Sequence, residues 1–375
     1  MVKNVGGEGM RIMLLANAGA IHSIRWANGL ASHGVEVHLV SAHRLSHDLD
    51  PRVTFHLLPV LAPLGYICSV VSLQRLLKVI EPDLLNAHYA TGYGLLARLS
   101  RFRPLLLSVW GSDVYDFPVK SKLHRWFLRK NLSAATAIGS TSRCMAAETA
   151  KTFQAEHVFI TPFGVDEKLF LPVGGARKAG ELIIGTVKTL GSKYGIDTLI
   201  AAFAHACSAI GDDVDIRLEI SGDGPDREEL TSLARRLHIG SKVTFHGWVA
   251  HSDVPAMLHR MDIYVALSRL ESFGVAILEA GACELPVVVS DADGPVEVTV
   301  NGKTGFIVPR EDPVAAAEAL LVLIRSAQLR KDMGSAGREQ VLANYTWEHS
   351  IELMIKAYRQ VGAIHQRENG AGKLS

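Results

Sequence analysis

The chain has 375 residues, of which 48% are hydrophobic and 21% charged; this composition is typical of folded proteins and unlike that of a largely disordered chain. Its length suggests roughly two domains. The formal net charge of +1 excludes a protein that binds nucleic acid through its overall charge, and four widely spaced cysteines without a C-x-x-C pair argue against a zinc site or a disulfide framework.

The chain start and one uncharged stretch bear on where the protein resides. Residues 1–9 contain no apolar segment of the kind found in a signal peptide, which predicts a cytoplasmic protein. Residues 57–74 carry no charge, but two prolines and a glycine interrupt them, and unpaired backbone is poorly tolerated in lipid. We therefore expect a loop here, followed by a partly buried helix over 68–80.

Short apolar runs with helical spacing between them predict a parallel sheet in the first part of the chain. The runs at 11–17 and 35–41 flank an amphipathic stretch at 24–32, which indicates a strand, a helix and a strand. Further apolar runs lie at 84–88, 105–109, 137–140 and 158–161. Apolar strands that alternate with helices are typical of a parallel sheet covered on both faces.

The pattern restarts after a segment rich in glycine and alanine at 172–180, which resembles an interdomain connection. The predicted fold is α/β, with two Rossmann-like doubly wound domains that face a cleft at their strand carboxyl ends. We expect domains over 1–168 and 169–346, and a last helix at about 347–363 that can pack back on the first. Strands of the second domain are expected at 182–187, 216–221, 242–246, 263–266, 286–290 and 305–308.

The segment Glu271 to Glu279, ESFGVAILE, is the most informative for chemistry. Ser272 is a candidate N-cap of an apolar helix, and the backbone N–H groups of its first turn would favour an anion such as a sugar-nucleotide diphosphate. Glu279 could bind a ribose and Glu271 sugar hydroxyls. From these residues alone, two capping or exposed glutamates are an equally good interpretation. The candidate N–H groups belong to Phe273, Gly274 and Val275.

Glu271 and Glu279 match the E-x7-E pattern of retaining GT-B glycosyltransferases, in particular family four, and 271–286 follow the family's E-x-F-G-x4-E-A-x-A-x3-P form. Three further segments resemble family motifs in the right order: FGVD at 163–166, SGDGP at 221–225 and HGWV at 246–249. The resemblance covers about residues 11–361. It implies a first domain on the acceptor side and a second that binds a nucleotide-sugar, with Gly222 and Val249 among the donor-binding residues.

Two lysines follow the first strand of the second domain, where a doubly wound sheet places phosphate ligands. In the family this loop reads R-x4-K, and both cations neutralise the leaving diphosphate without a metal ion; here the positions are Lys188 and Lys193. A lysine at 188 keeps the charge but loses the bidentate guanidinium fork. Solvated loop lysines are the alternative interpretation.

In the first domain, His88 follows a buried strand and matches the family histidine that contacts the donor sugar near the reacting carbon. A lone histidine there is otherwise more often a structural hydrogen-bonding group. The next strand ends in Trp110-Gly-Ser-Asp113, where relatives often have H-G-S-D, so Asp113 is a candidate acceptor-side group while Trp110 departs from the pattern. Gly19 resembles part of the family's glycine loop.

Two departures from the family pattern and one rival motif concern the second domain. Glu284 stands where relatives usually have glycine, and Asp293-Gly294 replaces a glycine pair. Asp291 and Asp293 also form a D-x-D sequence, which in GT-A enzymes binds manganese. We retain this metal-binding alternative, but the other motifs favour an enzyme with no metal or other cofactor.

A basic segment with aromatic residues lies at 117–131, and it belongs to a half with a surplus of positive charge. Residues 1–170 hold 18 Lys and Arg against 12 Asp and Glu, a net charge of +6, while 171–375 hold 21 against 26, a net charge of −5. Basic residues around aromatics suit an anionic membrane interface; the alternative is a helix that buries its apolar side in its own domain. The candidate membrane residues are Lys120, Lys122, Arg125, Trp126 and Arg129.

These observations predict a retaining, metal-independent glycosyltransferase that moves a sugar from a nucleotide-sugar to a glycan or lipid-linked acceptor. His88, Lys193 and Glu271 are its candidate catalytic residues, and no nucleic-acid partner is expected. The expected location is the cytoplasm, at the inner face of the membrane if the basic segment binds there. A non-hydrolysing nucleotide-sugar epimerase and a non-catalytic nucleotide-sugar-binding protein are the alternatives.

Overall fold

The computed structural model describes residues 9–172, 181–211 and 214–371. The chain divides into two compact units, one containing Gly164–Thr346 and the other the residues before and after that range. The division falls a few residues before the expected boundary at 168/169, and the last helix belongs to the first unit. The chain start to residue 8 and nearly all of the expected connection at 172–180 lie outside the described residues.

The first unit is built on a seven-stranded parallel sheet with strand order β3-β2-β1-β4-β5-β6-β7. The predicted parallel sheet is confirmed, and each predicted strand is present within a few residues of its expected bounds. β3, a half-exposed edge strand, was not predicted. The strands are β1 (Arg11–Leu15), β2 (Glu36–Ser41), β3 (Thr54–Leu57), β4 (Leu84–His88), β5 (Leu105–Val109), β6 (Ala137–Ser140) and β7 (Val158–Ile160).

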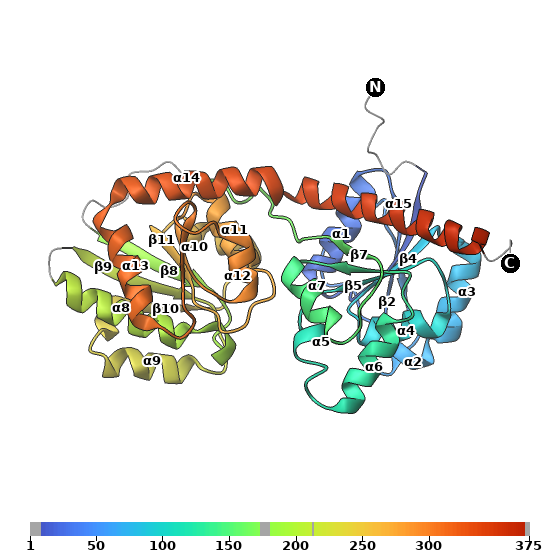
Figure 1. The fold of residues 1–375 in the computed structure, drawn as a ribbon, viewed down its shortest axis with the longest axis horizontal. Coiled ribbons are helices and arrows are strands. Elements are labelled where there is room, and N and C mark those ends of the chain that lie inside the picture. The colour runs from blue at the N-terminus through green and yellow to red at the C-terminus, as the bar shows by residue number, and fades with distance from the viewer. Residues whose placement is uncertain (1–8, 173–180, 212–213, 372–375) are drawn as a thin grey trace, which may run out of the picture. The chain divides into compact units, whose positions relative to one another are not determined.

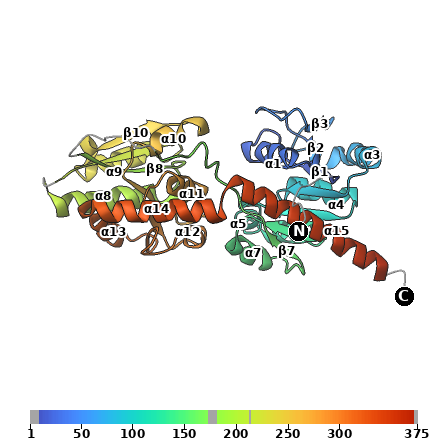
Figure 2. The same cartoon turned by 90° about the horizontal axis from the view of Figure 1, so that it is seen from above.

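Helices cover both faces of this sheet, and Figure 2 shows α1 and α3 on opposite sides of β1 and β2. Leu73 and Leu77 of α3 and Leu128 of α6 belong to one buried apolar cluster with the strands. The uncharged stretch begins as a loop, as expected, and the helix expected over 68–80 is present as α3; the short helix α2 before it was not predicted. The helices are α1 (Ile21–Ser32), α2 (Gly65–Cys68), α3 (Val70–Ile80), α4 (Gly92–Ser100), α5 (Ser112–Tyr115), α6 (Lys122–Leu132), α7 (Arg143–Ala150) and α15 (Trp347–Ala371).

The second unit has a six-stranded parallel sheet with strand order β10-β9-β8-β11-β12-β13. Its strands are β8 (Glu181–Val187), β9 (Asp215–Ser221), β10 (Val243–Gly247), β11 (Ile263–Ala266), β12 (Val287–Ser290) and β13 (Gly305–Val308). Its helices are α8 (Ile196–Ile210), α9 (Arg227–Arg236), α10 (Val254–Leu258), α11 (Val275–Ala282), α12 (Asp293–Val298), α13 (Pro313–Arg325) and α14 (Ala327–Asn344), with three single 3-10 turns. α8 packs against α13, and Phe203 of α8 is fully buried in the apolar core of this unit.

The last helix, α15, packs on α1 within the first unit, as Figure 1 shows in red. The rings of Trp26 and Trp347 lie 5.0 Å apart, and Ile351 lies so close to Gly29 that a side chain at 29 would overlap it. Because Ile351, Met354, Ile355 and Tyr358 are all buried, α15 forms part of the unit's core. From residue 347 onward the chain therefore belongs again to the first unit.

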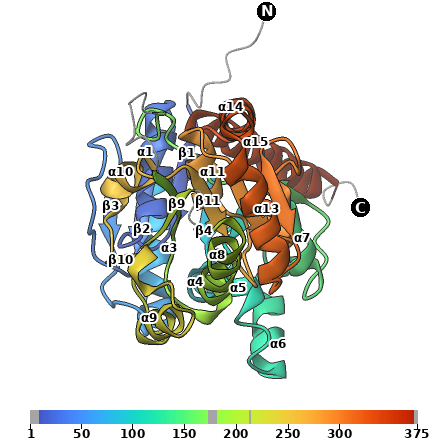
Figure 3. The ribbon, with the colours of Figure 1, turned by 90° about the vertical axis from the view of Figure 1, so that its left-hand side faces the viewer.

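α6 lies at the edge of the first unit, away from its sheet (Figures 1 and 3). Its inner face buries Leu128 and Leu132, while Leu123 and Trp126 are 69% and 53% exposed. The alternative interpretation, in which the helix buries its apolar side in its own domain, therefore does not hold for these two residues. Among the described residues, no helix combines the length and the apolar character that crossing a membrane needs.

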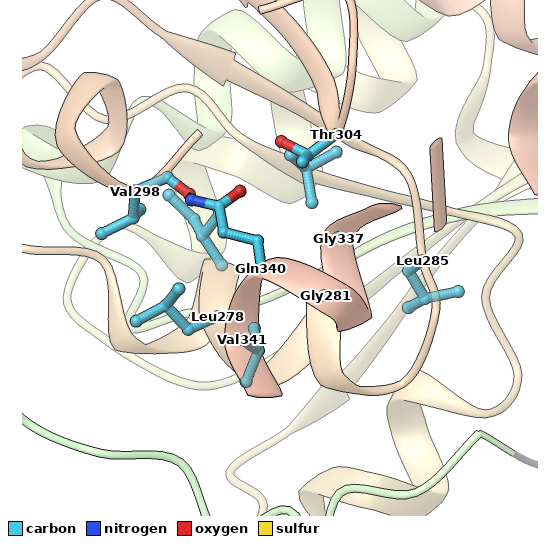
Figure 4. Close-up of a pocket in the computed structure, with 10 residues that line it drawn as sticks. Leu278, Gly281, Leu285, Val298, Thr304, Gly337, Gln340 and Val341 are labelled. Carbon is cyan, nitrogen blue, oxygen red and sulfur yellow. The ribbon is translucent and has the colours of Figure 1, made fainter. Parts of the chain in front are cut away.

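α11 and α14 pack closely in the second unit, with a small apolar pocket beside the contact (Figure 4). Gly281 of α11 and Gly337 of α14 face each other there, next to Val341. The pocket has a volume of about 10 Å³, at the lower limit for one water molecule. It is a packing defect and is too small for a substrate.

Candidate functional site

The end of β8 places Lys188 at the carboxyl edge of the second sheet, where its ammonium meets Glu271. The Lys188 Nζ to Glu271 Oε2 distance is 2.5 Å, and Ser268 Oγ donates to the same oxygen at 3.0 Å. Both charged side chains are largely buried, 12% and 14% exposed. Burial alone would lower the pKa of Lys188, but the Glu271 carboxylate, together with the neighbouring Tyr264 and Tyr194, outweighs burial, so the pKa lies above its usual value. The structure thus brings two predicted donor-site residues into one ion pair.

Lys193 lies in the single 3-10 turn Ser192–Tyr194, and its side chain is exposed. Its ammonium lies 5.1 Å from the centre of the Tyr194 ring, and that of Lys188 lies 5.0 Å from the same centre. Both contacts are within cation–π range. Tyr194, which the sequence did not suggest, therefore links the two lysines, and Lys193 is the one accessible to a ligand.

A glycine turn after β9 supports this lysine loop. Gly222 has a φ of +137°, and a Cβ there would overlap the carbonyl group of Lys188, so glycine is required by both conformation and space. Its N–H donates to the carbonyl of Gly247 at the end of β10. Val249 follows in the same loop and is half-buried. The predicted donor residues Gly222 and Val249 thus lie on adjacent loops at one sheet edge.

The helix after Glu271 starts later than expected. α11 begins at Val275, and the residue in the N-cap position is Gly274 with a φ of +109°, whereas Ser272 was the predicted N-cap. A left-handed conformation at the cap favours glycine over serine, which accounts for the shift. Phe273 is buried, and its ring lies 6.0 Å from that of Tyr345. Gly274 and Val275, but not Ser272, therefore form the helix start.

Glu279 lies on α11 and is almost fully buried, with its Oε1 3.0 Å from Nε2 of His251. His251 is partly exposed and packs edge-on against Phe170 at 5.6 Å. No role was predicted for His251, although it stands only two residues after Val249. The Glu279 carboxylate thus has a partner near the surface of the second unit.

His88, the last residue of β4, is only 1% exposed. Its Nε2 lies 3.1 Å from Asn86 Oδ1, and its ring packs against Trp110 with the ring centres 4.5 Å apart. Burial lowers the pKa of His88 to about 3, so the ring is neutral at physiological pH. Trp110, which departs from the family pattern, is therefore part of the histidine's immediate surroundings.

Asp113 holds two loops of the first unit together. One carboxylate oxygen accepts from the N–H of Ala90 at 2.9 Å, and the other from the N–H groups of Trp110 and Gly111 at 3.1 and 2.9 Å. Burial raises the pKa of Asp113, and these amide bonds oppose the shift. Direct contact with an acceptor stays a prediction for this buried group. Gly19 is exposed in the loop between β1 and α1, where its N–H donates to Asn17 Oδ1.

The alternative metal site uses Asp291 and Asp293. Asp291 Oδ1 accepts from the backbone N–H and from Nε of Arg310, both at 2.9 Å, and Asp293 is the first residue of α12. Within the part of the chain that the structure describes, no three His, Cys, Asp or Glu side chains gather as a metal site needs. The neighbouring Gly294 packs against the backbone of Phe273, where a Cβ would overlap.

Comparison with known proteins places both units in one enzyme class. The family described as "Glycosyl transferases group 1" matches residues 171–340, and the family described as "Glycosyl transferase 4-like" matches 11–142. N-acetyl-alpha-D-glucosaminyl L-malate synthase of Bacillus anthracis is 24% identical over 91% of this chain and 93% of its own. A GDP-mannose-dependent phosphatidylinositol monomannoside mannosyltransferase of Mycolicibacterium smegmatis is 29% identical over 68% of this chain and 69% of its own.

Solved structures show the same fold. Sucrose-phosphate synthase from Thermosynechococcus elongatus superposes with a TM-score of 0.80 at 22% identity, covering 94% of this chain and 99% of its own. Anabaena HepE, solved in complex with UDP-glucose, gives a TM-score of 0.72 at 19% identity over 94% and 99% of the two chains. Since the two family matches together span most of the chain and the architecture is that of these enzymes, the protein is a GT-B glycosyltransferase of the group 1 family, with two Rossmann-like domains.

Proposed function

We propose that this glycosyltransferase is a retaining, metal-independent enzyme that moves a sugar from a nucleotide-sugar donor to a glycan or lipid-linked acceptor, in cell-surface polysaccharide or glycolipid synthesis. The observation that carries the proposal is the cationic loop of the second unit, where the ammonium groups of Lys188 and Lys193 lie 5.0 and 5.1 Å from the centre of the Tyr194 ring. Relatives named for a GDP-mannose-dependent reaction and a neighbour solved with UDP-glucose support a nucleotide-sugar donor.

The second unit would bind the donor diphosphate. Lys193 is exposed and supplies a positive charge, while Lys188 is already held by Glu271. The start of α11 at Gly274 and Val275 adds backbone N–H groups, which favour an anion at a helix N-terminus. Preorganised cations and N–H groups stabilise the negative charge that develops as the nucleoside diphosphate leaves. Glu279 would bind the ribose and Glu271 the sugar hydroxyls.

The first unit would supply His88 and the acceptor side. Asp113, the carboxylate predicted at this edge, is buried with both oxygens occupied by loop amides, so it is poorly placed to attack a sugar. This supports front-face attack, in which the acceptor hydroxyl bonds to the anomeric carbon, the bond to the diphosphate breaks, and a donor phosphate oxygen takes the proton. The anomeric configuration is then retained.

Peripheral contact with an anionic membrane completes the proposal. Trp126 and Leu123 of α6 are exposed beside basic residues, and Lys130 Nζ lies 6.0 Å from the Trp126 ring. An exposed aromatic flanked by cations suits a headgroup interface. Such contact would bring the first unit to a lipid-linked acceptor at the cytoplasmic face.

The direct test incubates the protein with UDP-, GDP- and ADP-sugars, with and without EDTA and lipid-linked acceptors, and measures nucleotide release. We expect turnover of one donor only with its acceptor, unchanged by EDTA, and an NMR-detected product with the donor's anomeric configuration. Inhibition by EDTA would support the Asp291 and Asp293 alternative instead, and an inverted product would contradict retention. Release of a free epimerised nucleotide-sugar would identify an epimerase.

Two matched variants test the donor and membrane contacts. Lys193→Gln should weaken donor binding in calorimetry, whereas Lys303→Gln, at another exposed lysine of the same unit, should not.

Trp126→Ser should reduce binding to phosphatidylglycerol vesicles, with Trp248→Ser as the control because Trp248 is also exposed, in the second unit. Equal behaviour of either variant and its control would remove that part of the proposal.

A further inference from the structure

His88 carries a buried ring nitrogen without a visible role. Its Nε2 is paired with Asn86 Oδ1, but its Nδ1 is buried and has no hydrogen-bond partner among the residues that the structure describes. Buried polar atoms are nearly always paired. An unpaired nitrogen on a residue at the carboxyl end of β4 therefore calls for a partner from outside the chain.

The orientation of the Asn86 side chain is fixed by its other contacts. Its Nδ2 lies 3.0 Å from the carbonyl oxygen of Leu106 and 2.9 Å from Ser108 Oγ. A backbone carbonyl can only accept, so the NH2 group must face Leu106 and the amide oxygen must face the opposite way. Asn86 Oδ1 is consequently an acceptor on the side of His88.

A tyrosine from the last helix reaches the same oxygen. The hydroxyl of Tyr358, on α15, lies 2.9 Å from Asn86 Oδ1, and the side chain is buried. Burial raises the pKa of Tyr358, so the hydroxyl keeps its proton. It therefore donates a hydrogen bond to Asn86 Oδ1. The oxygen then accepts from both Tyr358 O–H and His88 Nε2–H. Since the ring of His88 is neutral, its proton is on Nε2 and Nδ1 holds a free lone pair.

We propose that Asn86 and Tyr358 are positioning residues that hold His88 in the Nε2–H tautomer, so that Nδ1 accepts a hydrogen bond from a hydroxyl of the bound sugar. This inference rests on the proposed function and makes α15 a contributor to the sugar site. His88 then acts as a hydrogen-bond acceptor and neither gives nor takes a proton. Trp110 packs on the imidazole and is itself only half-buried, so this side of the ring lies nearest to solvent among the contacts of His88.

The tautomer can be measured without any assay of activity. Protein labelled with ¹⁵N at the histidine rings, with the His88 signals assigned from a His88→Gln sample, should show a protonated Nε2 and an unprotonated Nδ1 in multiple-bond ¹H–¹⁵N spectra. A protonated Nδ1 or an imidazolium at neutral pH would overturn the proposal. Because no substrate is needed, this result stands apart from the proposed reaction.

Recognition of a hydroxyl is tested by adding UDP-glucose, GDP-mannose and the donor accepted in the turnover assay, each at saturation. We expect the Nδ1 resonance of His88 to move toward the position of a hydrogen-bonded nitrogen with the accepted donor alone or with donor and acceptor together. If nucleotide is released but Nδ1 does not move, hydroxyl recognition fails while the transferase assignment stands. If no donor is turned over, the proposed function itself fails.

Two variants separate positioning from folding. Asn86→Leu should yield both His88 tautomers, and Tyr358→Phe, which keeps the ring, should lower kcat/KM about tenfold, the effect of losing one well-placed hydrogen bond. Met354→Leu changes a buried side chain on the same helix and is the packing control. Equal kcat/KM for Tyr358→Phe and Met354→Leu would overturn the role of Tyr358. If Asn86→Leu does not fold, the wild-type spectrum still decides the tautomer.

Discussion

The two units use the carboxyl ends of similar parallel sheets in different ways. In the second unit charged side chains meet opposite charges there, as in Lys188 with Glu271 and in Asp291 with Arg310. In the first unit burial disfavours the charged forms of both His88 and Asp113. The shared architecture therefore leaves the charge of each site to the loops, and this difference underlies the proposal that the second unit binds a diphosphate and the first neutral hydroxyls.

The largest expected effect breaks the charge pair of the second unit. Glu271→Gln leaves the Lys188 ammonium largely buried without its carboxylate, and removing one member of such a pair costs about 3 kcal/mol of the free energy of unfolding. Urea unfolding measures this cost. Glu311→Gln removes an exposed partner of Arg269 and should cost under about 1 kcal/mol. Similar losses in both variants would show that burial of the pair contributes nothing.

The matching test of the first unit uses pH. Because the pKa of folded His88 lies at about 3 and that of an unfolded histidine at about 6.5, the unfolded chain binds more protons between these values. Folding stability is therefore unaffected by this group above pH 6.5 and falls as the pH drops below it, by about 2 kcal/mol at pH 5.

Urea unfolding of wild type at pH 7 and pH 5 measures the loss, and His88→Gln should reduce it by that amount. His47→Gln, at an exposed histidine of the same unit, should leave the pH dependence unchanged. If His88→Gln loses as much unfolding free energy between pH 7 and pH 5 as the wild type does, His88 is not a neutral buried group in the folded protein.

A smaller effect concerns the backbone of the second unit between α11 and β12. Glu284 has a φ of 60°, a left-handed conformation that costs a non-glycine residue about 1 kcal/mol. Glu284→Gly should therefore raise the free energy of unfolding by about that amount. Glu339→Gly, at an exposed position in α14, should lower it by about 1 kcal/mol. Destabilisation by both changes would rule out strain at Glu284.

The sequence predicted the features that depend on local pattern. Strands such as Leu84–His88 were found because buried parallel strands are continuous apolar runs. Glu284 was recognised as a departure because relatives usually have glycine there, and its φ of 60° in the structure accounts for that preference. β3 was missed because an edge strand with Thr54 and His56 lacks such a run. The start of α11 was misplaced because a conformation at Gly274, and not a serine side chain, sets it.

Partners distant in the sequence could not be predicted from any pattern. His251 with Glu279 and Tyr358 with Asn86 meet only because separate elements pack together. The same holds for the N–H of Ala90, which donates to Asp113 from a separate loop. Motifs therefore located the candidate site, whereas the charge state and hydrogen bonding of its members required the folded chain.

The smallest expected effect separates packing from charge in the second unit. Gly337→Ala adds a methyl group that would lie 3.5 Å from Cα of Gly281, an ordinary contact beside the small pocket of Figure 4. Replacing glycine in the interior of α14 should stabilise the unit by roughly 0.5–1 kcal/mol. Gly334→Ala is the control on the same helix, because its Cβ would overlap the carbonyl oxygen of Glu284, and it should destabilise. Gly337→Ala should therefore raise the midpoint of urea unfolding. If donor binding depends on charge at the strand ends, the same variant should leave donor affinity in calorimetry unchanged. A loss of affinity would mean that the packing of α11 also determines the geometry of the donor site.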